Sequence, residues 1–255
     1  MVKTWNISFP ATVQKERRRR AYVYLPTMYK EQPRRRFPVL YMFDGHNVFF
    51  DEHSSHGHSW RLAEYLDFAG IPLIVAAVEC NHSPENGRLS EYSPWNFSDA
   101  EVGYVEGRGH ATMEWFVHSF KALIDRRYRT IPWREKTFIG GSSMGGLMSL
   151  YAVAQYNCIF SRAAALSPHV WSSKAELIKL LRHAPMADDT VIYMDWGSAE
   201  VDRHMARGQR DVADALFDRG VALTARVVPG GDHSEASWER QASFFIETLM
   251  YGVDA

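Results

Sequence analysis

The chain has 255 residues, of which 46% are hydrophobic and 13% aromatic, and its formal net charge at pH 7 is -1. This amount of apolar material indicates a folded protein with a sizeable core and excludes a disordered chain. The balanced charge disfavours a dedicated nucleic-acid-binding protein, which would usually be strongly basic.

The sequence lacks the features that mark a secreted, membrane-bound or disulfide-rich protein. Its first residues hold no apolar segment of the signal-peptide kind, and the longest apolar stretch, at 71–78, is too short to span a bilayer. Cys80 and Cys158 both lie in apolar segments, which favours two buried free thiols. We therefore expect a cytoplasmic protein with no nucleic-acid or membrane partner, and the sequence leaves open whether it forms a homo-oligomer.

Short β-branched and aromatic runs alternate with longer amphipathic segments, which is the pattern of an α/β protein. Two early strands, at 5–9 and 21–25, should pair antiparallel at one edge of a sheet. The later strands are continuous apolar runs, typical of parallel strands buried on both faces. These strands are expected at 39–43, 73–79, 136–140, 163–166, 191–195 and 223–228. Helices are expected at 60–67, 113–128, 143–156, 174–182, 205–219 and 237–251.

No repeat, low-complexity linker or change of composition divides the chain, so we predict a single domain over residues 1–255. Only residues 81–111 lack clear periodicity, and they contain two prolines and four glycines. A loop of this length in a compact domain is usually functional, and we predict that it acts like a lid.

The segment at 137–151, TFIGGSSMGGLMSLY, carries the clearest chemical signal. A nucleophilic serine at a sharp turn between a strand and a helix needs small residues two positions before and after it. Ser143 has Gly141 and Gly145 at these positions, whereas Ser142 has Met144 two positions after it. The pattern therefore predicts a nucleophile elbow with Ser143 as the nucleophile.

The same turn predicts part of an oxyanion hole. The backbone N–H of Met144 lies at the expected start of a helix, where free donors and the helix dipole favour an anion. A second donor is expected in the loop after the strand at 39–43, and we prefer the backbone N–H of His46.

A serine hydroxyl needs a general base, and in α/β-hydrolases an acid and then a histidine follow the serine along the chain. His233 follows the last predicted strand, at the carboxyl edge of the sheet, and is the favoured base, with His169 as the alternative. An acid that orients the base is expected after the strand at 191–195. Glu200 is favoured there, and Asp195 and Asp202 stay open.

Six stretches, spread over nearly the whole chain in family order, carry a family resemblance: PVLYMFDGHNVFFD at 38–51, RLSEYSP at 88–94, GGSSMGG at 140–146, ALSP at 165–168, MDWGSAE at 194–200, and PGGDH at 229–233 with Trp238. The chain resembles the putative-esterase, esterase D-like branch of the α/β-hydrolases. That branch includes S-formylglutathione hydrolases, feruloyl and other carbohydrate-ester esterases, enterobactin-type siderophore esterases and, more distantly, mycolyltransferases.

The resemblance implies an α/β-hydrolase fold, with a mostly parallel sheet of about eight strands flanked by helices on both faces. It also implies a triad of Ser143, Glu200 and His233, with oxyanion donors at Met144 and His46. The chain departs from the family pattern where it has His46, since Gln is frequent there, and where it has Glu200, since Asp is frequent there.

These observations predict a serine carboxylic-ester hydrolase that acts on a small-molecule ester through an acyl-enzyme and needs no cofactor. An acyltransferase on the same triad, or a siderophore, feruloyl-type or acetyl-type esterase, is the alternative. A non-catalytic binding protein with the same fold is the least favoured. We expect five residues to contact the substrate: Asn47, Arg88, Tyr92, His169 and Trp196.

Three further segments have competing interpretations. The loop at 46–58 contains four histidines and several acids, but its spacing does not favour zinc, so we predict a solvated loop and no metal. The arginine-rich runs at 15–20 and 34–36 are predicted to be solvated, the first in a hairpin turn, with an anionic partner as the alternative. Around 88–95, an aromatic substrate lid competes with an internal pair of Arg88 and Glu91.

Overall fold

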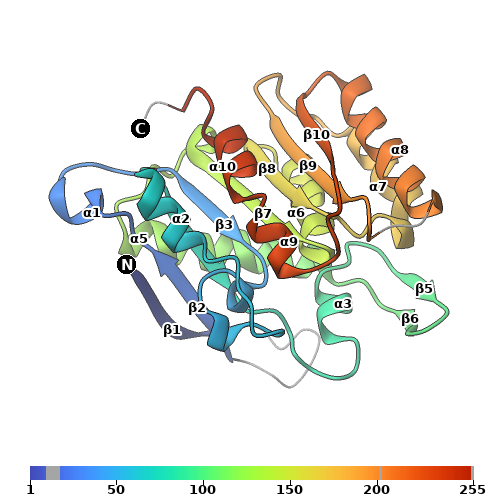
Figure 1. The fold of residues 1–255 in the computed structure, drawn as a ribbon, viewed down its shortest axis with the longest axis horizontal. Helices are drawn as coiled ribbons and strands as arrows, with labels where there is room; N and C mark the ends of the chain where they lie inside the picture. Colours follow the sequence, from blue (N-terminus) through green and yellow to red (C-terminus); the bar gives the residue numbers. More distant parts are fainter. Residues whose placement is uncertain (10–17, 201–202, 254–255) are drawn as a thin grey trace.

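The computed structural model describes residues 1–9, 18–200 and 203–253, which build a central sheet of eight strands (Figure 1). In spatial order the strands are β1 (Val2–Ser8), β2 (Arg18–Tyr24), β4 (Ile74–Val78), β3 (Val39–Met42), β7 (Thr137–Ser142), β8 (Arg162–Leu166), β9 (Val191–Gly197) and β10 (Ala222–Val228). β1 and β2 pair antiparallel, as do β2 and β4, and all other neighbours are parallel. The predicted α/β sheet with an antiparallel edge is confirmed.

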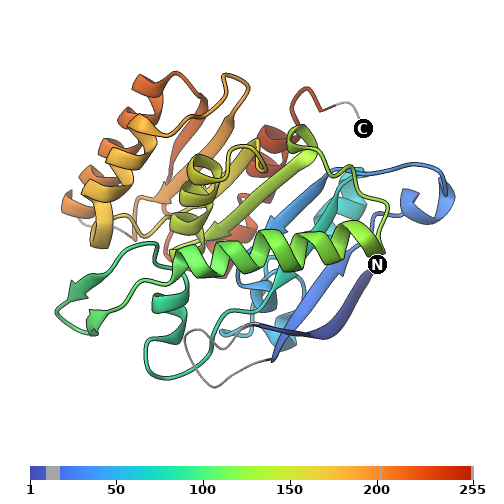
Figure 2. The same cartoon turned by 180° about the vertical axis from the view of Figure 1, so that it is seen from behind.

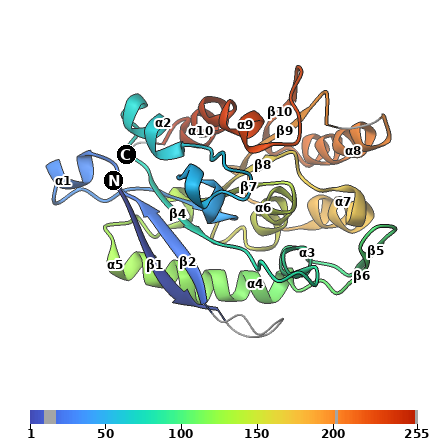
Figure 3. The same ribbon diagram turned by 60° about the horizontal axis from the view of Figure 1, so that its bottom comes forward.

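Helices cover both faces of this sheet. The helices of the described chain are α1 (Met28–Glu31), α2 (Leu62–Ala69), α3 (Gly87–Glu91), α4 (Gly109–Trp115), α5 (Ala122–Arg127), α6 (Met144–Gln155), α7 (Lys174–His183), α8 (Arg203–Arg219), α9 (Glu235–Glu239) and α10 (Ala242–Met250). A π-helical turn at Phe116–Lys121 joins α4 and α5, and Figure 2 shows them as one long green helix crossing the back of the sheet. α2 and α10 lie on the opposite face (Figure 3).

The strands are apolar on both sides because each face has its own core. In β3, Val39 and Tyr41 join the core under α4, α6, α7 and α8, whereas Leu40 and Met42 join the core under α2 and α10. Successive side chains of a strand point to opposite faces, so the run of four buried residues fills both layers. This confirms the predicted parallel strands buried on both faces for the middle of the sheet.

Some elements differ from the sequence-based prediction. β10 is half-exposed along its length rather than buried, because it is the last strand of the sheet and has β9 alone as its neighbour. The predicted helix at 237–251 is divided into α9 and α10. Cys80 and Cys158 are both free, as predicted, but Cys158 is exposed because it follows the end of α6.

The segment at 81–111 is more regular than the predicted loop. It contains α3 and the antiparallel strands β5 (Phe97–Asp99) and β6 (Gly103–Val105), which form a separate two-stranded hairpin beside the main sheet (Figure 1). None of these three elements is long enough to give a clear hydrophobic period, which explains why the sequence pattern did not reveal them. No helix in the described part of the chain is long and apolar enough to cross a membrane.

Candidate active site

The loops that follow the parallel strands meet at one edge of the sheet, and the sharpest turn there holds Ser143. This residue joins β7 to α6 with φ 55° and ψ -120°, a conformation that a non-glycine residue adopts only under strain. A Cβ on Gly141 would lie 2.9 Å from the carbonyl carbon of Gly145, so a larger residue at 141 would push the helix away. The predicted glycines therefore permit the close approach of strand and helix that the turn requires.

His233 is paired with a carboxylate in the way that a general base requires. It follows β10, and its Nδ1 lies 3.0 Å from Oε2 of Glu200, which follows β9. The Glu200 side chain is 1% exposed, and its Oε1 accepts a hydrogen bond of 2.6 Å from the backbone N–H of Gly197. The carboxylate is thereby held rigidly, and it can fix the tautomer in which His233 Nε2 is free to accept a proton.

Of the other acids considered, Asp195 has other hydrogen-bond partners than His233. It is buried, and it accepts hydrogen bonds from the Tyr193 hydroxyl at 2.6 Å and from the backbone N–H of Ser167 at 3.3 Å. Burial raises the pKa of Asp195 to about 6. Asp202 lies outside the described residues. Among the described candidates, the geometry therefore brings Glu200 to His233.

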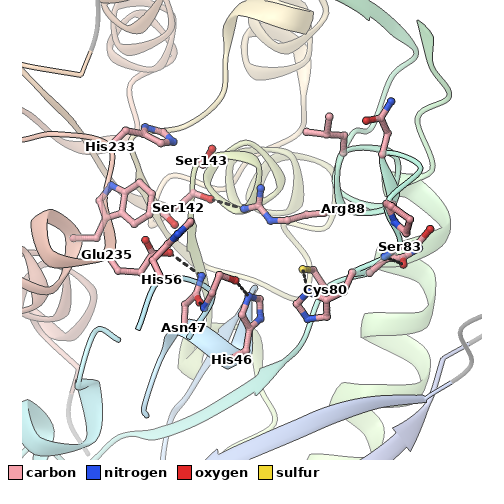
Figure 4. A pocket seen from close by; sticks show the side chains of 18 residues that line it. His46, Asn47, His56, Cys80, Ser83, Arg88, Ser142, Ser143, His233 and Glu235 are labelled. Atoms are coloured by element: carbon pink, nitrogen blue, oxygen red, sulfur yellow. Dashed lines mark hydrogen bonds between the residues drawn. The ribbon is translucent and has the colours of Figure 1, made fainter. Parts of the chain in front are cut away.

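A cavity of about 500 Å³ opens over the elbow, with Ser143 and His233 in its wall. In Figure 4 the His233 ring points toward the Ser143 hydroxyl. The lining is strongly polar and comprises His46, Asn47, Ser55, His56, Cys80, Asn81, His82, Ser83, Pro84, Asn86, Gly87, Arg88, Leu89, Ser142, Ser143, His233, Glu235 and Trp238. A ligand in this cavity meets hydrogen-bonding groups on most sides.

The two predicted oxyanion donors lie at the starts of two helical turns. Met144 is the first residue of α6, so its N–H has no acceptor within the helix. His46 lies in the 3-10 turn Gly45–Asn47 that follows β3, and its side chain lines the cavity. Burial lowers the pKa of His46 to about 4, so its ring is neutral near pH 7.

An ion pair between the partly exposed Arg88 and the buried Asp44 lies beside the cavity. Arg88 of α3 donates to both carboxylate oxygens of Asp44, at 2.8 and 2.7 Å, and the backbone N–H of Asp44 donates to the Tyr92 hydroxyl. Burial opposes ionisation of Asp44, but the Arg88 guanidinium holds the pKa of that carboxyl below its ordinary value. The pair joins the end of β3 to the segment at 81–111 beside Ser143.

The residues predicted to contact substrate divide into two groups. Asn47 and Arg88 line the cavity, whereas Tyr92, His169 and Trp196 are not among its lining residues. Tyr92 and Trp196 are buried in the core, 1% and 4% exposed. The His169 ring packs against Trp171, with a centroid distance of 3.8 Å, and burial lowers its pKa to about 4.

The predicted alternatives for the segment at 88–95 also need correction. Arg88 pairs with Asp44 rather than with Glu91. Glu91 instead accepts a hydrogen bond of 2.9 Å from Arg19 of β2, and both side chains are 2% exposed. Arg18–Arg20 therefore belong to a strand, with Arg19 buried, while the predicted hairpin turn falls on residues outside the described part of the chain. Trp95 packs against Tyr151 rather than in the cavity wall.

Sequence reasoning missed Glu235, which is buried in the cavity wall. Its Oε1 accepts a hydrogen bond of 2.7 Å from Asn47 Nδ2, and burial raises its pKa. Asn47 Oδ1 in turn accepts from Ser54 and Ser55. These contacts tie the loop at 46–58 to α9, and the position of Glu235 two residues after His233 was the one signal available in the sequence.

The histidines of the loop at 46–58 do not gather around a common point. His58 Nε2 lies 2.7 Å from Glu239, and the His53 ring packs against Phe50. Within the described residues, three side chains that could bind a metal do lie close together: His46, Cys80 and His82. The sequence did not predict Cys80 or His82 as metal ligands.

A strained serine between strand and helix, at the carboxyl edge of a mostly parallel sheet and beside a carboxylate-bound histidine, defines an α/β-hydrolase. Residues 12–250 match the model of the family described as Putative esterase, and the chain belongs to that family. It is therefore a carboxylic-ester hydrolase, in agreement with the resemblance predicted from the sequence.

Known proteins are similar to the chain in sequence or in fold. The chain is 27% identical over 251 residues to the uncharacterized protein YbbA of Bacillus subtilis (strain 168), covering 92% of this chain and 93% of YbbA. It is 26% identical over 148 residues to a siderophore triacetylfusarinine C esterase of Aspergillus fumigatus, covering 56% of this chain and 47% of that protein. A solved ferulic acid esterase structure has a TM-score of 0.71 at 18% identity, covering 98% of each chain.

Proposed function

We propose that the protein hydrolyses small-molecule esters with Ser143 as nucleophile, His233 as general base and Glu200 as the orienting acid. The observation that carries the proposal is the arrangement around one cavity: Ser143 in its strained turn, and His233 held by the buried Glu200. Nucleophile, base and orienting group are the three parts that serine catalysis needs.

Each step of the reaction has a residue that can perform it. His233 Nε2 accepts the hydroxyl proton as Ser143 Oγ attacks the ester carbonyl, and Glu200 stabilises the imidazolium that forms. The backbone N–H groups of Met144 and His46 hold the oxyanion of the tetrahedral intermediate. His233 then protonates the leaving alcohol, and water repeats the sequence to release the acid. No step calls for a cofactor.

The lining of the cavity favours a polar ester. His56, Asn81 and Asn86 face the cavity beside Arg88, and few large apolar side chains lie among them. A long alkyl chain would leave these groups without hydrogen bonds, whereas a hydroxylated aryl, sugar or hydroxy-acid ester would satisfy them. The names of the related ferulic acid and siderophore esterases are consistent with such substrates.

Location and partners belong to the same proposal. Two free cysteines and the balanced charge favour a cytoplasmic protein without a nucleic-acid partner.

The proposed hydrolase transfers the acyl group to water, whereas an acyltransferase on the same triad would transfer it to an alcohol or a thiol. With an added alcohol present, the ratio of free acid to newly formed ester measures that difference.

Covalent labelling tests the proposed nucleophile and base. A fluorophosphonate probe should add one probe molecule less HF to the intact protein, as Oγ–P bond formation displaces fluoride, and peptide mapping should place the adduct on Ser143 rather than on the adjacent Ser142. His233→Ala should abolish labelling, whereas His169→Ala, a change at the other candidate base, should retain it. Labelling on Ser142, or labelling that depends on His169, would contradict the proposal.

A further inference from the structure

Three side chains of the kinds that bind zinc gather in the wall of the catalytic cavity. They are His46, after β3, and Cys80 and His82, after β4, and one donor atom from each lies within 4.8 Å of the other two. Cys80 Sγ lies 4.0 Å from His82 Nδ1, and the His46 and His82 rings are 4.7 Å apart between centroids. Figure 4 shows His46 and Cys80 on the same side of the cavity, across from His233.

The His46 ring has a buried nitrogen with no hydrogen-bond partner in the described structure. This atom is Nδ1, and the residue is 4% exposed. A buried polar atom without a partner is costly, so it points to a ligand that would satisfy it. The other ring nitrogen, Nε2, lies 3.0 Å from Ser55 Oγ. A hydrogen bond on the second nitrogen is what orients a metal-binding histidine and leaves the first one deprotonated.

The spacing and the donor types fit a tetrahedral zinc ion. Ligand atoms around such an ion lie about 3.3–3.8 Å apart, since zinc bonds are about 2.0–2.3 Å long. The distance of 4.0 Å between Cys80 and His82 is only slightly longer, and His82, which is exposed, can adjust. One thiolate and two imidazoles suit zinc rather than magnesium or calcium, which prefer oxygen.

We propose that His46, Cys80 and His82 bind a zinc ion in the wall of the catalytic cavity and that the bound ion inhibits the esterase. Binding converts the Cys80 thiol into a zinc-bound thiolate and releases one proton to solvent. Three protein ligands leave a fourth position, which faces the cavity and takes water. The inhibition rests on the proposed function, because the ion and its water would occupy space beside the proposed oxyanion donor at His46.

Spectroscopy tests the site independently of catalysis. The protein of 255 residues, freed of metal with a chelator, is titrated with Co²⁺, a spectroscopic substitute for zinc. We expect one equivalent to bind, with a thiolate-to-cobalt charge-transfer band in the near ultraviolet, and Zn²⁺ to displace it. Cys80→Ser should remove the charge-transfer band, and His82→Ala should weaken binding more than about 100-fold, since even an outer partner of a metal ligand contributes about 10–100-fold.

His56→Ala is the matched control, because His56 lines the same cavity but lies outside the cluster. Cobalt binding should be unchanged in this variant. Absence of the charge-transfer band in the parent, its persistence in Cys80→Ser, or a loss of binding in His56→Ala would overturn the site.

A second measurement tests the inhibition. Zinc should lower ester hydrolysis by the parent reversibly, with recovery on adding chelator, and should have little effect on His82→Ala relative to that variant's own metal-free rate. Stoichiometric cobalt binding with unchanged hydrolysis would overturn the inhibition and leave the site standing. If the protein hydrolysed no ester, the proposed function would fail while the cobalt spectrum still decided the site.

Discussion

Ser142 and Ser143 are adjacent, yet the backbone gives them different surroundings. Ser142 is the last residue of β7, in extended conformation, whereas Ser143 occupies the turn with φ 55°. The difference follows from the glycines two positions before and after Ser143, which could be read from the sequence. The acid of the triad could not be fixed in this way, because Asp195 lies near the end of β9 and Glu200 just after it, and their side-chain directions depend on packing that no local pattern encodes.

Glu200→Gln tests the proposed acid at the scale of one residue. The amide can no longer hold the His233 tautomer, so we expect kcat/KM for ester hydrolysis to fall about 10²–10⁴-fold with little change in folding. Asp195→Asn is the matched control, since Asp195 hydrogen-bonds to Tyr193 and Ser167 instead. Its kcat/KM should change less than about tenfold. An equal loss in both variants would contradict the assignment of Glu200.

At the scale of elements, the site depends on how closely α6 approaches the neighbouring strand ends. A Cβ on Gly146 would lie 3.0 Å from Pro168 Cα, and one on Gly141 would meet the backbone of Gly145. The segment at 81–111 is likewise fixed to the sheet, by Arg88 on Asp44 and by Arg19 on Glu91. These long-range pairs join residues far apart in the sequence, which is why the sequence alone suggested a local Arg88–Glu91 pair.

Gly141→Ala tests the closeness of β7 and α6. The added methyl group would lie 2.9 Å from the Gly145 backbone, so the elbow must open, and we expect a loss of about 1–3 kcal/mol in the free energy of unfolding together with most of the activity. Gly140→Ala is the control, because its Cβ would lie 3.0 Å from Met42 Sδ, in a flexible side chain, and 3.4 Å or more from the nearest backbone atom. Urea unfolding and ester hydrolysis measure both effects. Equal behaviour of the two variants would contradict the argument.

At the scale of the whole molecule, the α/β-hydrolase sheet could be predicted because its strands are continuous apolar runs between amphipathic helices. The parallel strands of the main sheet, β3, β4, β7, β8, β9 and β10, were each located to within a few residues. The hairpin β5–β6 could not be located, and the exposure of β10 could not be predicted, since short and edge strands depend on tertiary neighbours rather than on their own periodicity. The sequence placed Ser143, His233 and Arg88 in the site, but it could not predict most of the other cavity residues, because they come from several separate loops.

The buried carboxyl of Asp195 makes global stability depend on pH. Burial raises its pKa from 3.8 to about 6, so the folded state keeps a proton that the unfolded chain releases. The stability that this proton supplies is full below about pH 4 and is lost as the pH rises through about 6. His46 and His169, with lowered pKa values, act in the opposite direction, so the effect of Asp195 is best seen as a difference between variants.

Asp195→Asn removes this one contribution. Relative to the parent, the free energy of unfolding of the variant should improve between pH 4 and pH 7, by up to about 3 kcal/mol for a shift of about two pKa units. Urea unfolding of both proteins at several pH values measures the difference. A difference that stays constant with pH, or that grows against the variant as pH rises, would contradict the raised pKa.

The most direct test of the central claim is steady-state hydrolysis of p-nitrophenyl acetate and butyrate by the parent, Ser143→Ala and Ser142→Ala. The two serines are neighbours in the same cavity wall, so the variants differ in little except the residue in the strained turn. We predict that Ser143→Ala lowers kcat by at least about 10³-fold while Ser142→Ala retains turnover. Full activity in Ser143→Ala, or its loss only in Ser142→Ala, would contradict the account.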